Sequence, residues 1–109
     1  MTHRLHLAAT PFRLIKSGRK VVELRLYDAK RRKIDVGDVV LFVGPRGQEI
    51  KARVVDLLNF ATFDDLFQVV SPSDLGCESI QEARAIIRGF YTPEDELNNS
   101  VLGIRFEML

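Results

Sequence analysis

The sequence predicts an α+β fold in which about five to six strands form a curled sheet or small barrel, with helices inserted after the first strand and before the last. Most predicted strands come early, two helices come late and a strand closes the chain. Strand, helix and strand follow one another only at the beginning, and no glycine-rich phosphate loop follows any strand. These observations argue against a doubly wound parallel sheet.

The first three elements are predicted at the start of the chain. Residues 4–7 alternate polar side chains with leucine, which indicates a strand. Thr10 and Pro11 provide an N-cap and a first helical residue, and Gly18 suits the end of that helix. The valine- and leucine-rich residues 21–26 then predict a second strand.

A hairpin is predicted next. Gly37 and Asp38 turn the chain into the apolar strand 39–43. The turn 44–47 contains glycine and proline and leads into a long strand over residues 49–58. A strand of this length is expected to bend or bulge.

Two capping boxes predict helices in the second half of the chain. Thr62 with Asp65 opens a short helix, and Ser79 with Glu82 opens a longer one over residues 80–88. The longer helix carries an apolar stripe that is expected to pack in the core, formed by Ala83, Ile86 and Ile87.

The chain is predicted to end with a loop and a strand. Residues 92–100 are acidic, which favours a loop. Residues 101–108 alternate as a closing strand does, and the side chains expected to point inward are Leu102, Ile104 and Phe106.

Length and composition bound the kind of protein. With 109 residues, 46% of them hydrophobic, the chain is the size of one domain, 1–109, that can bury a core without metals or disulfides. The lone Cys77 fits a reducing compartment, and no Cys and His spacing predicts a zinc site or a cofactor. His3 and His6 are interpreted as surface residues of the first strand. Without an apolar signal core or a run long enough to span a membrane, we expect a cytoplasmic protein.

Charge is divided unevenly along the chain. Residues 1–53 contain 13 Lys and Arg against 5 Asp and Glu, whereas the remainder contains 3 basic and 10 acidic side chains. The two halves therefore carry +8 and −7. A positive surface region of this kind suits phosphate, and mutual neutralisation of the halves within the fold is an equally good alternative.

Three charges of mixed sign mark the predicted second strand. Glu23 and Arg25 are two residues apart, so they share one face with Cβ atoms about 6.6 Å apart, close enough to bracket a small polar ligand. Lys20 has the wrong parity and joins them only if the turn at Gly18 or a bulge redirects it at the strand entrance. The alternative is the solvated face of an edge strand. The opposite face is expected to meet the core through Val22, Leu24 and Leu26.

In their order and spacing, these features resemble the ASCH domain family of the PUA-like superfamily, in its small single-domain bacterial or archaeal type. The resemblance covers nearly the whole chain and rests on Pro11, Phe12, Ile15, Gly18, Lys20, Glu23, Arg25, Gly37, Asp38, Gly103 and Ile104. It implies a PUA-like small β-barrel with a cleft beside the first helix, where Lys20, Glu23 and Arg25 meet. It also implies binding of RNA or a nucleotide, in RNA metabolism or in regulation associated with translation or transcription.

The same resemblance offers an enzymatic alternative. One bacterial branch hydrolyses N4-acetylcytidine with a lysine, a threonine nucleophile and a glutamate, and another branch has been described as a ribonuclease. Glu23 stands at the threonine position, and a carboxylate is a poor substitute for a hydroxyl nucleophile. Asp74 and Glu78 are the only candidates near the position of the family glutamate, and both suit a loop or a cap equally well. If the protein is an enzyme, Lys20 and Glu23 are its catalytic candidates.

The charges favour recognition over catalysis. Beside Glu23, Lys20 is expected to stay charged, so it would bind an oxyanion rather than remove a proton. Arg25 and Lys20 would then engage a phosphate or a base carbonyl, while Glu23 accepts a hydrogen bond from an exocyclic amine.

The expected partner is single-stranded RNA or a nucleotide, because no basic recognition helix suits duplex DNA. Arg19 and the basic run 30–33 would follow the phosphate backbone, and Tyr27 or Tyr91 would stack on a base. Packing in the core or in a loop is the more frequent role of each tyrosine. A third hypothesis is a protein-interaction module that ignores RNA and uses the acidic half or an exposed apolar patch.

Overall fold

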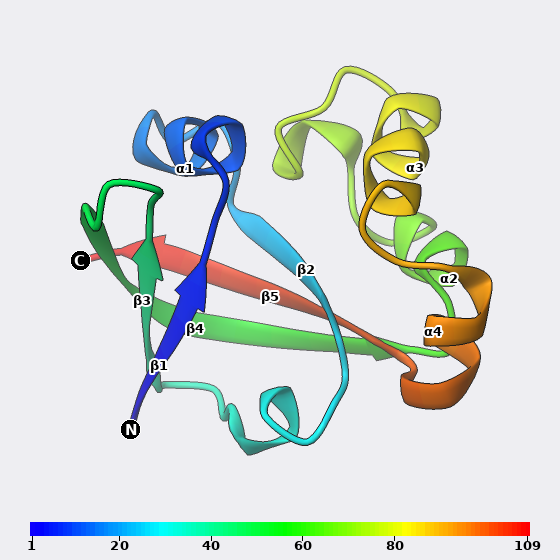
Figure 1. Ribbon diagram of the computed structural model, residues 1–109, viewed down its shortest axis with the longest axis horizontal. Helices are drawn as coiled ribbons and strands as arrows, with labels where there is room; N and C mark the ends of the chain where they lie inside the picture. The colour runs from blue at the N-terminus through cyan, green and yellow to red at the C-terminus, as the bar shows by residue number, and fades with distance from the viewer.

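A computed structural model describes residues 1–109 as one curled five-stranded sheet with four α-helices (Figure 1). The strands are β1 (Thr2–His6), β2 (Val22–Leu26), β3 (Val39–Val43), β4 (Glu49–Phe60) and β5 (Val101–Met108). The helices are α1 (Ala9–Lys16), α2 (Phe63–Phe67), α3 (Ile80–Arg88) and α4 (Pro93–Asn99), with short 3₁₀ helices at Arg31–Lys33 and Pro72–Asp74. The predicted α+β class is confirmed. No helix combines the length and the hydrophobicity needed to cross a membrane.

The sheet is a curled half-barrel whose two edges are the first two strands of the chain. The strand order is β1–β3–β4–β5–β2, with β1 parallel to β3 and every other neighbouring pair antiparallel. As Figure 1 shows, α1 connects the two edge strands across the open side of the curl. The register of β4 against β5 shifts between Val54 and Asp56, which confirms the expected irregularity in the longest strand.

Hydrophobic side chains cover both faces of the sheet. The cluster inside the curl joins α1 to β1, β3, β4 and β5 and includes the predicted inward residues Leu102, Ile104 and Phe106. The second cluster joins the other face to α2 and α3, and Val22 of β2 is fully buried in it. Because side chains alternate along a strand, Glu23 and Arg25 point away from Val22, toward the inside of the half-barrel.

The acidic segment after α3 is a helix, so the prediction of a loop there is wrong. Thr92 and Asp95 form a reciprocal capping box, and Pro93 occupies the first turn of α4. The helix lacks an apolar stripe and is anchored by a charge instead. Glu96 is buried and accepts hydrogen bonds from Arg88 Nη2 at 3.0 Å and from the backbone N–H of Phe63 at 3.4 Å.

Two expectations for the first strand and helix are also wrong. His3 is buried rather than exposed, and its Nε2 lies 2.8 Å from Asp38 Oδ2. This hydrogen bond is the main reason that the pKa of Asp38 is lowered to about 2. Helix α1 begins at Ala9, and the Thr10 side chain caps no backbone N–H. Proline is accepted throughout the first turn of a helix, so Pro11 does not fix the first helical position.

Candidate functional site

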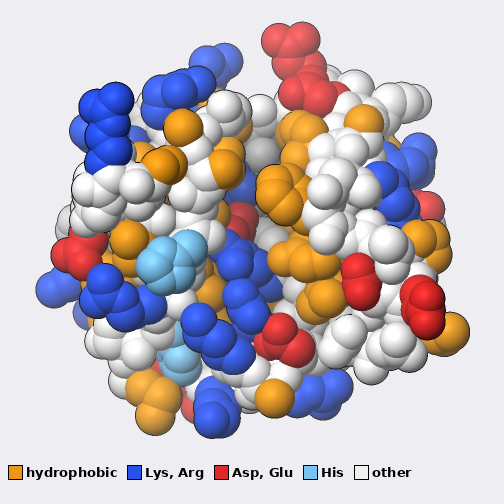
Figure 2. Space-filling model, in the orientation of Figure 1, with side chains coloured by type: hydrophobic (Ala, Val, Ile, Leu, Met, Phe, Trp, Pro, Cys, Tyr) orange, Lys and Arg blue, Asp and Glu red, His pale blue; other side chains and the backbone are white.

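A cleft of about 480 Å³ separates α1 from α3, with β2 at its bottom. Figure 2 shows the hollow between the two lobes, with charged side chains inside it. On the side of β1 and α1 it is lined by His6, Leu7, Ala8, Thr10, Pro11 and Leu14. On the other side it is lined by Leu75, Gly76, Cys77, Glu82, Ala83, Ile86, Ile87, Phe90 and Tyr91. The residues at the bottom are Lys20, Glu23, Leu24 and Arg25.

The structure brings Lys20, Glu23 and Arg25 together in this cleft. Lys20 Nζ lies 2.8 Å from Glu23 Oε1, and Arg25 Nη2 lies 2.8 Å from Glu23 Oε2. Arg25 Nε also donates to Oε2, at 2.9 Å. The side chains of Lys20 and Arg25 are 13% exposed, and that of Glu23 is 5% exposed. These three residues, the charged triad, are therefore not the solvated face of an edge strand.

Glu23 is ionised despite its burial. Burial acts to raise the pKa of its carboxyl group, but the charges of Lys20 and Arg25 and their hydrogen bonds outweigh it and lower the pKa. The triad then carries a net charge of about +1 at the bottom of a largely apolar cleft. Such a floor favours a ligand that presents acceptor oxygens or a negative charge.

Arg25 also connects the two edges of the half-barrel. Its Nη2 donates to the carbonyl oxygen of His6 at 2.8 Å, where β1 ends. This one side-chain hydrogen bond links β1 to β2, which share no backbone ladder, and together with the bonds to Glu23 it orients the guanidinium. The Nη1 group of Arg25 donates no hydrogen bond within the protein and is available to a ligand.

Lys20 joins the triad from outside the strand, as the parity of β2 requires. It precedes β2 and forms an isolated bridge with Leu75. Gly18 has a φ of 79°, which turns the chain after α1, and the backbone N–H of Lys20 donates to Leu14 O at 3.1 Å. The predicted redirection at the strand entrance is what the structure shows.

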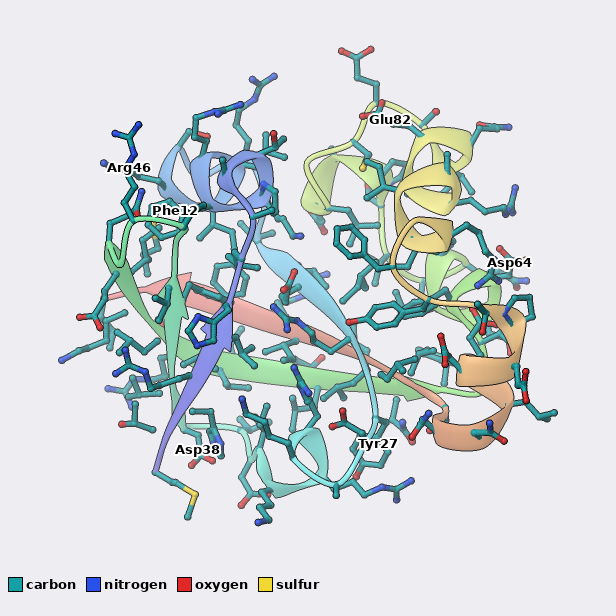
Figure 3. The ribbon with its side chains drawn as sticks, in the orientation of Figure 1. Phe12, Tyr27, Asp38, Arg46, Asp64 and Glu82 are labelled. Atoms are coloured by element: carbon teal, nitrogen blue, oxygen red, sulfur yellow. The ribbon has the colours of Figure 1, made fainter.

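The two tyrosines proposed to stack on a base lie in different places. Tyr91 lines the cleft, with one ring face stacked on Phe63 at a centroid distance of 5.8 Å. Its pKa is raised, first by burial. Tyr27 lies outside the cleft, in the lower part of Figure 3, and Arg32 covers its ring at 4.5 Å.

The aromatic residue that sequence reasoning missed is Phe90. It lines the cleft while 64% exposed. The sequence signal that could have identified Phe90 is its place directly after Gly89, the glycine that ends α3. A side chain that follows the last residue of a helix is not held on the packed face of that helix.

The acidic candidates Asp74 and Glu78 do not line the cleft. Asp74 Oδ2 is paired with Arg105 at 3.2 Å, and Glu78 is exposed. Glu82 lines the cleft instead, at its mouth, where Figure 3 labels it. Ile86, predicted as core, is 48% exposed on the same wall. No group of three or more His, Cys, Asp or Glu side chains lies close enough to hold a metal ion.

The opposite charges of the two halves do not neutralise each other through ion pairs. Each of the nine ion pairs in the structure joins two groups from the same half of the chain. Within the basic run 30–33, Arg31 is paired with Asp28 at 2.9 Å. Arg19 has no ion-pair partner and lies in a groove beside the cleft.

Comparisons with known proteins agree with this architecture. The family model of the ASCH domain matches residues 5–107, whereas no curated protein sequence matches the chain significantly. The crystal structure of hypothetical protein PH0355 is 31% identical, with a TM-score of 0.87 over 100% of both chains. The solution structure of protein PF0455 from Pyrococcus furiosus is 33% identical, with a TM-score of 0.77 over 100% of this chain and 98% of that chain.

More distant structures share the fold. The ASCH domain from Lactobacillus crispatus has a TM-score of 0.68 at 16% identity and covers 98% of this chain and 79% of its own. ASCH from Zymomonas mobilis has a TM-score of 0.64 at 16% identity over 97% and 66% of the two chains. The predicted PUA-like architecture is thereby confirmed. The chain belongs to the ASCH domain family, which is generally associated with RNA binding.

Proposed function

We propose that the cleft binds a nucleobase, of single-stranded RNA or of a free nucleotide, through Lys20, Glu23 and Arg25. The observation that carries this function is the Glu23 carboxylate, which holds both cations at 2.8 Å at the bottom of the cleft and so orders them through contacts within the protein. Groups that are already ordered lose little conformational entropy on binding, so their hydrogen bonds contribute more to affinity. Such binding would serve RNA metabolism or regulation associated with translation or transcription.

The triad retains unused donors beside an unused acceptor. The Lys20 ammonium has three N–H groups and bonds Glu23 with one, while Arg25 keeps its Nη1 group. Glu23 Oε1 accepts only from Lys20, which leaves it a lone pair. A base edge with an acceptor atom beside an exocyclic amine, as in cytosine, complements this arrangement.

Binding is favoured over hydrolysis of an N4-acylcytidine or of RNA by the state of the groups in the cleft. Glu23 has a lowered pKa and is neutralised by two cations, which makes it a weak base. The pKa of the Cys77 thiol is raised, first by burial, so little nucleophilic thiolate forms at neutral pH. Neither residue is thus activated for attack on an amide or a phosphate.

The function is tested by incubating the purified protein with a panel of modified nucleosides and short RNAs and reading binding and product together by mass spectrometry. Retention of intact ligands by the wild-type protein, and their loss from Lys20→Met, is the expected result. Release of cytidine from an N4-acylcytidine, or cleavage of RNA, would show that the cleft is an active site. A protein that retains no member of the panel would favour the protein-interaction module.

Phe90→Ala is expected to weaken binding of a single-stranded RNA of about eight nucleotides by about 10-fold, because base stacking on an exposed aromatic ring stabilises such complexes by about 1–3 kcal/mol. Phe90 is 64% exposed, so the thermal midpoint should change little. Leu97→Ala is the matched control, since Leu97 is 85% exposed on α4 and does not line the cleft. Fluorescence anisotropy measures both affinities, and equal values for the two variants would contradict a stacking role.

A further inference from the structure

We propose that a basic groove beside α1 holds the phosphate backbone of the strand whose base enters the cleft, which makes the ligand an oligonucleotide rather than a nucleoside. This inference rests on the proposed function of the cleft. The groove has a volume of about 470 Å³ and is lined by Thr10, Arg13, Leu14, Lys16, Ser17 and Arg19. Thr10 and Leu14 also line the cleft, so the two depressions adjoin each other.

The positive charge of the groove is uncompensated. No acidic side chain lines it, and Arg13, Lys16 and Arg19 form no ion pair. Seven of the 16 Lys and Arg side chains do form ion pairs, including all three of the acidic half. Figure 2 accordingly shows Lys and Arg side chains gathered over the lobe that contains α1. A surface that lacks its own counter-charges suits a polyanion.

Stabilisation of α1 alone does not account for these residues. Basic side chains in the last turn of a helix interact favourably with its dipole, which applies to Arg13 and Lys16. Arg19 lies beyond the helix end, however. Three carbonyl oxygens of the last turn already accept backbone hydrogen bonds: Arg13 O from Ser17 at 3.0 Å, Leu14 O from Arg19 at 2.9 Å and Lys20 at 3.1 Å, and Ile15 O from Gly18 at 3.0 Å. These three oxygens present little free acceptor character that would repel a phosphate.

The turn at Gly18 divides consecutive residues between the two depressions. Arg19 lines the groove, and Lys20, its neighbour in the chain, lies at the bottom of the cleft. A base and the phosphate of its own nucleotide are likewise neighbours a short distance apart. One strand therefore places its base against the triad and its backbone against Arg19, and the adjoining phosphates continue along Arg13 and Lys16.

The experiment compares two triple variants by fluorescence anisotropy with a labelled, mixed-sequence single-stranded RNA of about eight nucleotides. The groove variant is Arg13→Ala, Lys16→Ala, Arg19→Ala. The control variant removes the same charge from exposed residues of the basic half that line neither depression, as Arg4→Ala, Lys51→Ala, Arg53→Ala.

For three lost phosphate contacts to a single strand, the slope of log affinity against log salt becomes shallower by about 2. Raising the salt from about 50 to 200 mM should therefore reduce the RNA affinity of the groove variant by a factor about 20-fold smaller than the factor for the wild-type protein. At the lower concentration the groove variant should bind the RNA at least about 20-fold more weakly, and the control variant should stay within about 2-fold of wild type.

Nucleoside binding separates this inference from the function on which it rests. Cytidine, measured by chemical-shift perturbation, should bind the groove variant and the wild-type protein equally, because the triad is intact. An unchanged RNA affinity and salt slope in the groove variant would overturn the inference while leaving the cleft function standing, as would an equal loss in the control variant. If the wild-type protein binds neither cytidine nor the RNA, the cleft function and this inference fail together.

Discussion

Replacing Glu23 with alanine is expected to lower the free energy of unfolding by about 3 kcal/mol, because removing one partner of a buried ion pair leaves the other charge uncompensated. Here two charges are left, since Lys20 and Arg25 each lie 2.8 Å from the Glu23 carboxylate. Both cations are 13% exposed, so some water reaches them, which sets the loss at the lower end of the range for buried pairs. Urea unfolding at neutral pH measures the difference.

Glu23→Gln is the conservative control, and its pH dependence identifies the charge as the cause. The amide keeps the shape and one acceptor oxygen, so we expect a loss of roughly 1–2 kcal/mol. The folded-state pKa of Glu23 lies below its ordinary value of 4.5, so its ionic contribution is fully present above pH 4.5 and disappears as the pH falls through the folded-state pKa. The gap between wild type and Glu23→Gln should therefore shrink on acidification, and a gap that widens would contradict the lowered pKa.

Elements with strong local signals could be predicted from the sequence, whereas the pairing of distant strands could not. The N-caps predicted before α2 and α3 are present in the structure, with Thr62 and Ser79 each accepting a hydrogen bond from a backbone N–H. The reciprocal bond of a full capping box is absent, since Glu82 accepts from the backbone N–H of Glu78 instead of that of Ser79. Helix α4 was missed because its signal is confined to the cap at Thr92, and Leu97 is 85% exposed rather than part of an apolar stripe. The partner of β2 is the last strand of the chain, and no local pattern encodes that choice.

The charged triad could also be predicted, because the signals that bring its three residues together are local in the sequence. Strand parity alone put Glu23 and Arg25 on one face, and Gly18 marked the turn that admits Lys20. The opposite wall of the cleft comes from α3, far along the chain. Periodicity identified Ile86 as apolar but cannot distinguish a side chain that faces the core from one that faces an open cleft.

Arg25→Lys is expected to weaken binding of the labelled RNA by about 30-fold, or about 2 kcal/mol, because hydrogen bonds to charged groups contribute about 1.5–3 kcal/mol each. Lysine keeps the positive charge but has no planar fork. Arg25 bonds Glu23 through Nε, bonds His6 O through Nη2 and keeps Nη1 for a ligand. The single terminal nitrogen of lysine cannot take these three positions at the same time. Specific loss of affinity with the charge retained would show that the geometry of the guanidinium, and not its charge, recognises the base.

Arg105→Lys is the matched control for this substitution. Arg105 also bonds a carboxylate with two nitrogens, as both Nη1 and Nη2 lie 3.2 Å from Asp74 Oδ2, but it does not line the cleft. The Arg105→Lys variant should bind the RNA as tightly as the wild-type protein does. Loss of the His6 bond should also reduce the stability of Arg25→Lys by about 1 kcal/mol, a cost that urea unfolding measures separately. If Arg25→Lys loses this stability but binds RNA as tightly as wild type, Arg25 only connects β1 to β2, and recognition of the base would fall to Lys20 and Glu23.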